Sequence, residues 1–440
     1  MAPVVSFPLI AMDNMLVAAI IFVAALVLIF SEKLNRTIAA MLGAVVMVGV
    51  GNALGFYSEA QAIAAIDFAT LGLLLGMMTL VSLLQPTGFF EYVAIIAGRW
   101  SRGNPVRLMI LLGAITTILS MFLDNVTTVV LIAPVTVLIS EIVGLSPAPF
   151  LIAQAILSNT GGAGTLVGDP PNVIIGLQAD LSFVEFLVNA LPVVAVSWVV
   201  AVGLLLFLFR QELRVPALNS AALMQLRPAR ALDQPQTARR ILIVLGATIA
   251  VFFLQEPLGL SPTYIALAGA MFGLLWVRPN VEETLSRVEW TILVFFASLF
   301  VLVGGLERSG LLEQVARLFH NAVYLHPVLL GVLMIWAVAI LSAIVDNIPI
   351  TIALIPVIYE LGEFGINIQP LWWALVFGAG FGGNGTIIGS SANIVVVSVS
   401  ERTRTPITAL MWSKRGLPVM IAVCTVASIM FALLYGYFSR

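Results

Sequence analysis

Two acid–amide pairs lie inside long apolar stretches of the chain. Asp124-Asn125 interrupts the apolar stretch from Pro105 to Ser140, and Asp346-Asn347 interrupts a second one. A carboxylate at membrane depth costs at least roughly 2.5–3.5 kcal/mol, so it is a functional candidate by default. Because burial disfavours the charged form of a carboxyl group, either acid could bind and release a proton. The pattern predicts proton coupling at Asp124 and Asp346, and the alternative is that both acids only cap the helices that follow them.

A second polar motif also occurs twice, each time as a glycine-rich interruption of an apolar segment. The first copy runs from Asn159 to Asn172 and the second from Gly382 to Asn393. Glycines cost about 1 kcal/mol each in a helix relative to alanine, so both segments should unwind. Unwound backbone at membrane depth is tolerated where protein or a water-filled cavity surrounds it, and its carbonyl and N–H groups can then bind a solute or ion.

The residues that follow the glycines suggest a restarted helix. Asp169 precedes two prolines, and proline suits the first helical position, so we predict that Asp169 caps the next helix. Ser390 should do the same in the second copy. The asparagines of both copies either satisfy broken backbone or bind the ligand directly, and the sequence leaves these alternatives open.

The composition places these motifs in a membrane. Apolar residues make up 61% of the 440 residues and charged residues 10%, against roughly 45–50% and 25% in soluble domains. The single cysteine, Cys424, cannot form an internal disulfide or a cysteine-rich metal site. His320 and His326 lack acidic or cysteine partners at ligand spacing, so no metal site and no cofactor are predicted. The chain is predicted to be an all-α polytopic membrane protein.

The spacing of the motifs indicates a duplication. The acid–amide pairs are 222 residues apart, and the glycine-rich motifs 221. We predict a first repeat at 1–209, a polar, arginine-rich cytoplasmic linker at 210–240 and a second repeat at 241–440. Each repeat should hold five spans and a re-entrant hairpin centred on its acid–amide pair, because the arms of about 18 and 14 residues are short for a ~30 Å core. About ten spans and two hairpins result, and five spans per repeat invert the second repeat.

The distribution of charge supports one orientation. With the linker in the cytoplasm, seventeen Lys and Arg residues lie inside, against Arg308, Arg317 and Arg440 outside. Both termini are therefore predicted outside. An aromatic belt at the membrane interfaces is also predicted, consisting of Trp100, Trp276, Trp290 and Trp412.

The motifs resemble a known family. Phe-Leu-Asp-Asn-Val-Thr-Thr-Val, Gly-Asp-Pro-Pro-Asn-Val-Ile, Val-Asp-Asn-Ile-Pro and Gly-Gly-Asn-Gly-Thr-Ile-Ile-Gly-Ser-Ser-Ala-Asn are similar to the arsenite-efflux (ArsB), NhaD-type sodium/proton antiporter and melanosomal P-protein branch of the ion transporter superfamily. The resemblance covers nearly the whole chain. It implies a scaffold domain and a transport domain that moves in an elevator-like cycle. By motif match it places the substrate or ion site on Asp124, Asn125, Thr127, Gly162, Thr165, Asp169 and Asn172, and on Asp346, Asn347, Asn384, Thr386, Ser390 and Asn393.

The functional hypothesis follows from the buried acids and the resemblance. It is a secondary transporter of a prokaryotic inner membrane, not an enzyme, that expels trivalent arsenite or antimonite in exchange for protons. Sodium/proton antiport is the alternative, and an anion channel is a third, which unitary currents would distinguish from a carrier. An intramembrane aspartyl protease is disfavoured because Leu166-Val167-Gly168-Asp169 lacks the first glycine of Gly-x-Gly-Asp. A small solute or ion, protons and lipid are the expected partners. A soluble ATPase partner and a homodimer stay open.

Overall fold

All regular secondary structure among the described residues of the computed structural model is helical. The described residues are 7–31, 33–215, 218, 220–318 and 325–439, with the side chains of 7–13, 30, 220–222 and 315–318 left out. His320 and Arg440, and the side chain of Arg317, which entered the arguments on metal and charge, lie outside this description. No strand occurs in the described ranges.

Nine helices in the described part of the chain are long and apolar enough to cross a membrane. They are α2 (Arg36–Leu54), α4 (Phe68–Leu84, extended by η1, Gln85–Thr87), α6 (Pro105–Phe122), α7 (Asn125–Ile142), α10 (Phe183–Leu208), α12 (Pro235–Phe253), α16 (Trp290–Arg308), α18 (Pro327–Ile344) and α22 (Ala409–Leu433). Shorter apolar helices are α14 (Pro262–Val277), α21 (Ser391–Ser400) and the part Asn14–Ile29 of α1 (Phe7–Phe30). The predicted all-α polytopic fold is confirmed.

The other helices are short or connect these spans. They are α3 (Glu59–Ala64), α5 (Phe89–Ser101), α8 (Ala148–Gly162), α9 (Pro170–Gln178), η2 (Glu212–Arg214), α11 (Ser220–Gln225), η3 (Pro228–Arg230), α13 (Gln255–Leu258), α15 (Val281–Ser286), α17 (Leu311–Leu318), α19 (Asn347–Glu363), α20 (Gln369–Gly382) and α23 (Tyr435–Phe438). Helix α5 was not predicted from the sequence. Its polar residues, Glu91 and Arg99 among them, interrupt the apolar pattern that marked the other helices.

The duplication recurs element by element. Helices α6 to α10 correspond to α18 to α22, and the first four pairs start 221 or 222 residues apart. The arm predicted at 14 residues is wrong, because α7 continues through Pro134 to Ile142 and has 18 residues. At 1.5 Å per residue, α6 and α7 are each about 27 Å long. Length alone therefore no longer argues for a re-entrant hairpin, and the hairpin and the inverted orientation stay predictions.

Contacts divide the chain into two compact units. The smaller comprises Met1–Leu71, Glu289–Pro327 and Thr351–Ile368, and the larger comprises Gly72–Val288, Val328–Ile350 and Gln369–Arg440. Each unit draws on both halves of the sequence. All thirteen candidate residues belong to the larger unit, so the segments that could do chemistry fold together. The division into repeats at 1–209, 210–240 and 241–440 stays a prediction about the duplication.

The smaller unit is held by the packing of α1, α2 and α16. The Thr37 hydroxyl of α2 donates to the Thr291 carbonyl at 3.0 Å, and the Tyr57 hydroxyl donates to the Val301 carbonyl at the same distance. Burial, reinforced by Glu307, raises the pKa of Tyr57 to about 12. This phenol, which follows α2, therefore keeps its proton and its hydrogen bond across the physiological pH range.

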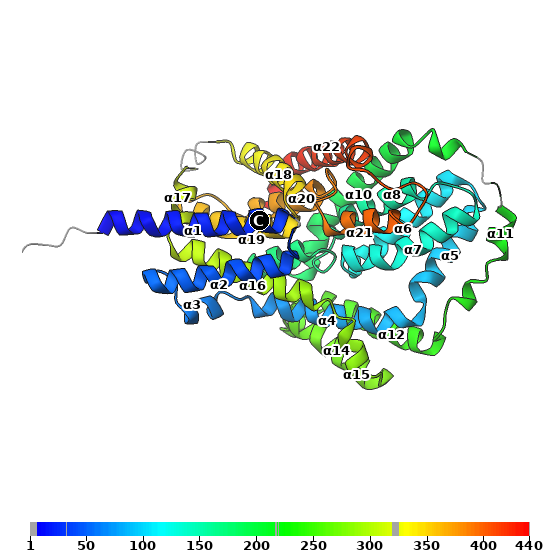
Figure 1. The fold of residues 1–440 in the computed structure, drawn as a ribbon, viewed down its shortest axis with the longest axis horizontal. Helices are drawn as coiled ribbons and strands as arrows, with labels where there is room; N and C mark the ends of the chain where they lie inside the picture. Colours follow the sequence, from blue (N-terminus) through cyan, green and yellow to red (C-terminus); the bar gives the residue numbers. More distant parts are fainter. Residues whose placement is uncertain (1–6, 32, 216–217, 219, 319–324, 440) are drawn as a thin grey trace, which may run out of the picture. The chain divides into compact units, whose positions relative to one another are not determined.

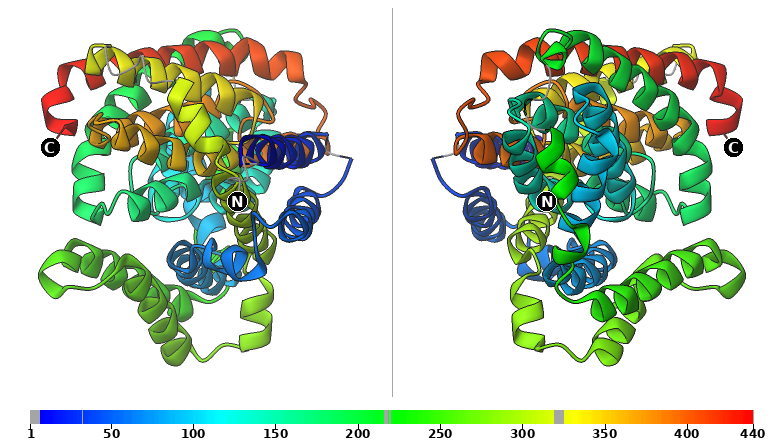
Figure 2. Two further views of the ribbon diagram at one scale, coloured as in Figure 1. Left: turned by 90° about the vertical axis from the view of Figure 1, so that its left-hand side faces the viewer. Right: turned by 90° about the vertical axis from the view of Figure 1, so that its right-hand side faces the viewer.

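In the larger unit, segments far apart in the sequence lie side by side. Helix α21 packs against α7 and α8, α6 packs along α8, and α10 packs along α22 (Figure 1). Helices α12 and α14 form another pair (Figure 2). The first and second repeats thus interleave at α7, α8 and α21, which bring the acid–amide pair and both glycine-rich segments close together.

Small residues allow α4 to approach α14 closely. Gly72 and Gly76 are four residues apart, so they share one face of α4. A Cβ at Gly76 would lie 2.6 Å from the Ala266 carbonyl carbon and 2.8 Å from its oxygen. Membrane helices rely on such close packing because lipid gives no hydrophobic drive for helices to associate.

Replacing Gly76 with Ala should destabilise the larger unit, since the new Cβ meets backbone that cannot rotate away. We expect a loss of about 1–3 kcal/mol, as for other overpacked cores. Thermal unfolding of the detergent-purified protein, followed by size-exclusion chromatography, measures it. Gly203→Ala in α10 is the matched control, because a Cβ there meets nothing within 4 Å. Equal melting temperatures for the two variants would contradict the close approach.

Candidate functional site

The junction of α6 and α7 places Asp124 at the start of a helix. Its backbone is extended (φ −60°, ψ 153°), and its carboxylate accepts hydrogen bonds from the Thr127 N–H at 2.8 Å and from the Thr127 hydroxyl. Asp124 is 8% exposed. Asp124 therefore caps α7, as the alternative interpretation of the sequence expected. Thr127 donates both hydrogen bonds to the carboxylate. Capping and proton exchange are compatible, because a protonated carboxyl group keeps one oxygen as an acceptor.

The second junction, between α18 and α19, also places its acid directly before a helix, and this acid bonds to a second helix as well. The Ser391 hydroxyl at the start of α21 donates to Asp346 at 2.7 Å, and the Ile348 N–H lies 3.4 Å from the other oxygen. The neighbouring amide of Asn347 reaches across to the first repeat and donates to the Asp169 carboxylate at 3.1 Å. Asp346 therefore ties α19 to α21, and Asn347 ties the second junction to the first broken helix.

Both glycine-rich segments are unwound and held by the same device. The Asn172 amide donates to the carbonyls of Gly162 and Thr165, each at 2.9 Å. The Asn393 amide donates to the carbonyls of the two matching residues of the second segment, at 2.7 and 2.8 Å. The N–H groups of Asn172 and Asn393 therefore bond to backbone carbonyls that the unwinding frees. Of the two roles considered for these asparagines, backbone support and direct ligand binding, their N–H groups serve the first. Without them the freed carbonyls would be buried and unpaired, at about 1–3 kcal/mol each.

Two threonines predicted as ligands also anchor backbone. The Thr165 hydroxyl donates to the Met121 carbonyl, and the Thr386 hydroxyl donates to the Ala343 carbonyl. Each bond fastens an unwound segment to the helix before the neighbouring acid–amide pair. Thr165 and Thr386 therefore build the site, and the Gly162 carbonyl is likewise already bonded, to Asn172.

The predicted N-cap position of Asp169 and Ser390 is confirmed, but the predicted capping by their side chains is wrong. Both residues occupy N-cap positions with extended backbone, at φ −145° and −155°, but neither side chain caps its helix. Asp169 turns to Asn347, and Ser390 donates to the Asn159 side chain at 3.0 Å. Because Pro170 and Pro171 carry no N–H group, the first turn of α9 offers Asp169 fewer backbone donors. The carboxylate is left for the site.

Asn159, the first residue of the first glycine-rich motif, was not predicted as a site residue, and neither was Ser391. The side-chain oxygen of Asn159 accepts from the Asn125 amide at 3.2 Å and from Ser390, and its amide donates to the side-chain oxygens of Asn384 and Asn393, each at 3.1 Å. The orientation is fixed, since the Asn393 amide is already committed to two carbonyls. Asn159 is 1% exposed. It joins the first broken helix to the second with all its hydrogen-bonding capacity used.

Trp412 is a further correction. It was assigned to an aromatic belt, but it is fully buried, and its indole N–H donates to the Asn384 carbonyl at 3.1 Å. The other three tryptophans of the predicted belt are 39–68% exposed, as a belt requires. Trp412 supports the second unwound segment instead. The sequence signal would have been its place in the first turn of α22, opposite an interrupted helix.

Three buried acids converge in this unit. Asp169 is 1% exposed and lies within electrostatic reach of both Asp124 and Asp346. One of its oxygens, Oδ1, is buried without a hydrogen-bond partner among the described residues. The described residues hold no group of three metal-binding side chains arranged for one metal ion. A buried carboxylate oxygen without a donor is costly unless it is protonated or bound to a cation.

No base offsets these acids within the segments that build the site. The sequence contains no Lys, Arg or His between Leu108 and Phe209, or between Pro327 and Glu401. The cluster therefore suits protons, a cation or a neutral hydroxylic solute. It would repel a free anion by charge.

Comparison with known proteins identifies the chain at the level of family. The family model of the CitMHS citrate transporters matches residues 26–378. The chain belongs to this family. A 46 kDa membrane protein of Mycobacterium leprae is 38% identical over 427 residues, which cover 95% of this chain and 98% of that protein. An uncharacterized transporter of Mycobacterium tuberculosis is 39% identical over 428 residues, covering 96% and 97%.

More distant relatives agree. The human P protein is 33% identical over 491 aligned residues, which cover 93% of this chain and 59% of the P protein, so the predicted resemblance is confirmed. The YdaH transporter of Alcanivorax borkumensis, whose crystal structure was described as having an unusual topology, shares the fold with a TM-score of 0.59 at 16% identity, covering 96% of this chain and 98% of that one. This CitMHS family member is thus a multi-pass membrane transporter.

Replacing Asn159 with Asp should disconnect the two broken helices, because a carboxylate cannot donate to the oxygens of Asn384 and Asn393 and adds a fourth buried acid. We expect a loss of about 3–5 kcal/mol, as for a buried charge that is left without a partner. Thermal unfolding in detergent measures the change. Asn52→Asp near the end of α2, where the asparagine is exposed, is the control. A melting temperature equal to that of the control would refute the bridging role.

Proposed function

We propose that this citrate transporter family member is a proton-coupled secondary carrier that expels trivalent arsenite or antimonite. Asp124, Asp169 and Asp346 exchange the protons. The observation that carries the proposal is the cluster of three buried acids in segments that contain no base. Adjacent carboxyl groups cannot all be ionised in a low dielectric, so at least one holds a proton that cargo can displace.

The charge of the site favours arsenite over a free tricarboxylate. Arsenite is a neutral trihydroxide near neutral pH, so it meets no electrostatic barrier among the three acids, whereas free citrate would be repelled. Its hydroxyl groups can donate to Asp169 Oδ1, which lacks a donor among the described residues. Cys424 is buried in α22 and single, so hydrogen bonds and not thiolates would hold the cargo.

Sodium/proton antiport is the second candidate, and Asp169 favours it as well. A free carboxylate oxygen next to an unwound segment is a suitable ligand for Na⁺. In that case Na⁺ and protons compete for one cluster. An anion channel is disfavoured by the lack of a base.

The remaining features of the proposal come from the family resemblance and the distribution of charge. The carrier works by an elevator-like alternating-access cycle in a prokaryotic inner membrane, with both termini outside. A soluble ATPase partner and a homodimeric state belong to the same proposal and call for copurification experiments.

Everted membrane vesicles test the cargo. Arsenite uptake should rise at least tenfold on energisation with a proton gradient and collapse with an uncoupler, whereas citrate uptake should not respond. Uptake that is indifferent to the gradient would overturn proton coupling.

The two cargo candidates give opposite results in proteoliposomes. If the cargo is arsenite, Na⁺ leaves an imposed proton gradient intact and arsenite dissipates it. If sodium/proton antiport is the function, Na⁺ alone dissipates the gradient. A gradient that neither solute affects would exclude both.

Asp124→Asn, Asp169→Asn and Asp346→Asn should each lower proton-driven transport at least tenfold, because an amide cannot exchange a proton near neutral pH. Asp180→Asn is the control, since Asp180 is exposed and has a positive φ of 53°, which asparagine tolerates. Transport over a range of pH, with the amount of folded protein measured in parallel, is the readout. A variant with wild-type pH dependence would remove that residue from the coupling group.

A further inference from the structure

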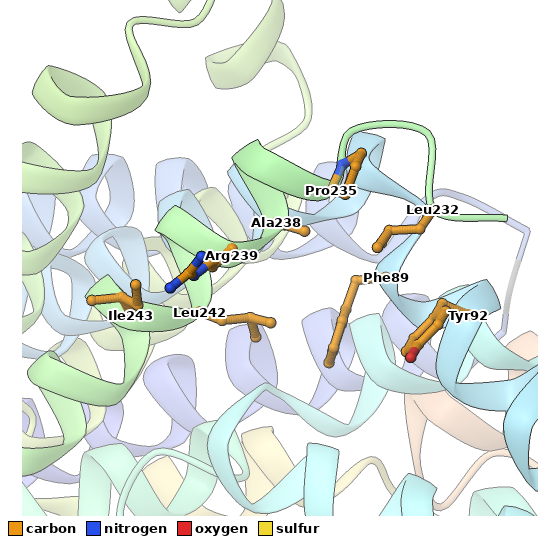
Figure 3. Close-up of a pocket in the computed structure, with 8 residues that line it drawn as sticks. All are labelled: Phe89, Tyr92, Leu232, Pro235, Ala238, Arg239, Leu242 and Ile243. Atoms are coloured by element: carbon orange, nitrogen blue, oxygen red, sulfur yellow. The ribbon is translucent and has the colours of Figure 1, made fainter. Parts of the chain in front are cut away.

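A cavity of about 360 Å³ lies on the larger unit, and none of the three buried acids lines it. Helix α5 forms one wall and the start of α12 the other (Figure 3). Its lining residues are Phe89, Tyr92, Leu232, Pro235, Ala238, Arg239, Leu242 and Ile243. The volume is within the range of small-molecule sites, roughly 300–1,000 Å³. All but one of the side chains are apolar or aromatic, and the exception is Arg239.

The chain segment that leads into α12 is held against the turn before α5, so the walls of the cavity are preformed. A Cβ at Gly88 would lie only 1.7 Å from the Ala231 carbonyl oxygen, and the backbone there has φ +75°. The Gln234 N–H lies 3.4 Å from the Thr87 carbonyl. The end of the linker between the two repeats thus packs directly on the turn before α5, and the two walls cannot separate without breaking this contact.

Arg239 brings a positive charge without a counter-charge. It is exposed, and among the described residues it makes no hydrogen bond or ion pair. It lies in the second turn of α12, at the end of a candidate membrane span. Leu242 and Ile243, one turn further along, are 36% and 49% exposed. At the end of a membrane span, a cation can bind the phosphate of a lipid, and exposed aliphatic side chains next to it can pack against the upper part of its acyl chain.

We propose that this cavity binds one anionic phospholipid. The acyl chain lies against Phe89, Tyr92 and Leu242, and the phosphate binds Arg239. The positive-inside reading places this end of α12 at the cytoplasmic leaflet, where anionic lipids attract basic residues at about 1 kcal/mol each.

The cavity floor packs against residues of the α6–α7 junction. Phe89, Leu232 and Ala238 pack in the same apolar cluster as Leu123 and Leu131. Leu123 immediately precedes Asp124. A lipid seated on this floor therefore supports the α6–α7 junction through contiguous side chains.

Native mass spectrometry of the full-length protein with phosphatidylglycerol tests the site. One lipid should stay bound per chain, and phosphatidylcholine should not replace it. Arg239→Gln should lower the bound fraction at least threefold. Arg240→Gln is the matched control, because Arg240 is adjacent and exposed but does not line the cavity. Arg102→Gln serves as a second control, since Arg102 lines a separate cavity of about 440 Å³.

Leu242→Trp fills the cavity without changing charge and should also lower lipid binding at least threefold, in protein that stays monodisperse. Equal losses in the Arg239 and Arg240 variants would mean only diffuse surface attraction and would overturn the site. Retention of phosphatidylcholine as strongly as phosphatidylglycerol, or full binding by the Trp variant, would overturn it too.

An effect on transport rests on the proposed function, whereas the binding assay does not. Transport in vesicles of phosphatidylcholine alone should be at least threefold slower than with phosphatidylglycerol added, and the Arg239 variant should not respond to the added lipid. Lipid binding without this response would separate the site from the proposed function.

Discussion

Three carboxyl groups lie buried in one unit of this protein, and the segments that hold them contain no base. Burial of even one such group is costly, and mutual repulsion adds to the cost. The fold compensates locally. Each acid accepts a hydrogen bond from a neighbouring side chain: Asp124 from Thr127, Asp346 from Ser391 and Asp169 from Asn347. One oxygen of Asp169 is still without a hydrogen-bond partner among the described residues, and protonation or a bound cation would supply the missing interaction there.

The interrupted helices solve a second problem, which is how to expose backbone in an apolar medium. Asn172 and Asn393 bond the carbonyls that the unwinding frees, and the glycines allow the chain to double back. A Cβ at Gly168 would lie 2.6 Å from the Gly162 carbonyl oxygen. Amides suit this task because they donate two hydrogen bonds without carrying a charge. The polar residues that identify the site in the sequence therefore use many of their hydrogen-bonding groups to stabilise the fold.

Sequence predicted the fold well because hydropathy and duplication act over long segments. It predicted individual side-chain roles less well. Asp169 and Ser390 have the sequence context of helix caps, but only tertiary contacts show that their side chains turn away. Asn159 gave no repeat signal, since the matching position is Gly380, where a Cβ would lie 3.0 Å from that of Ala163. Helix α5 was missed because its mixed polarity does not resemble a span, although its packing against α6 and α7 places it beside the site.

The asymmetric position of Asn159 has a mechanical consequence. One side chain from α8 bonds to the unwound segment after α20 and to the start of α21, so the two interrupted helices are joined at their interruptions. Segments joined by such a buried hydrogen-bond network move together as one rigid body. Any rearrangement that carries cargo from one side of the bilayer to the other has to bend at joints outside this rigid body, and the search for hinges can begin there.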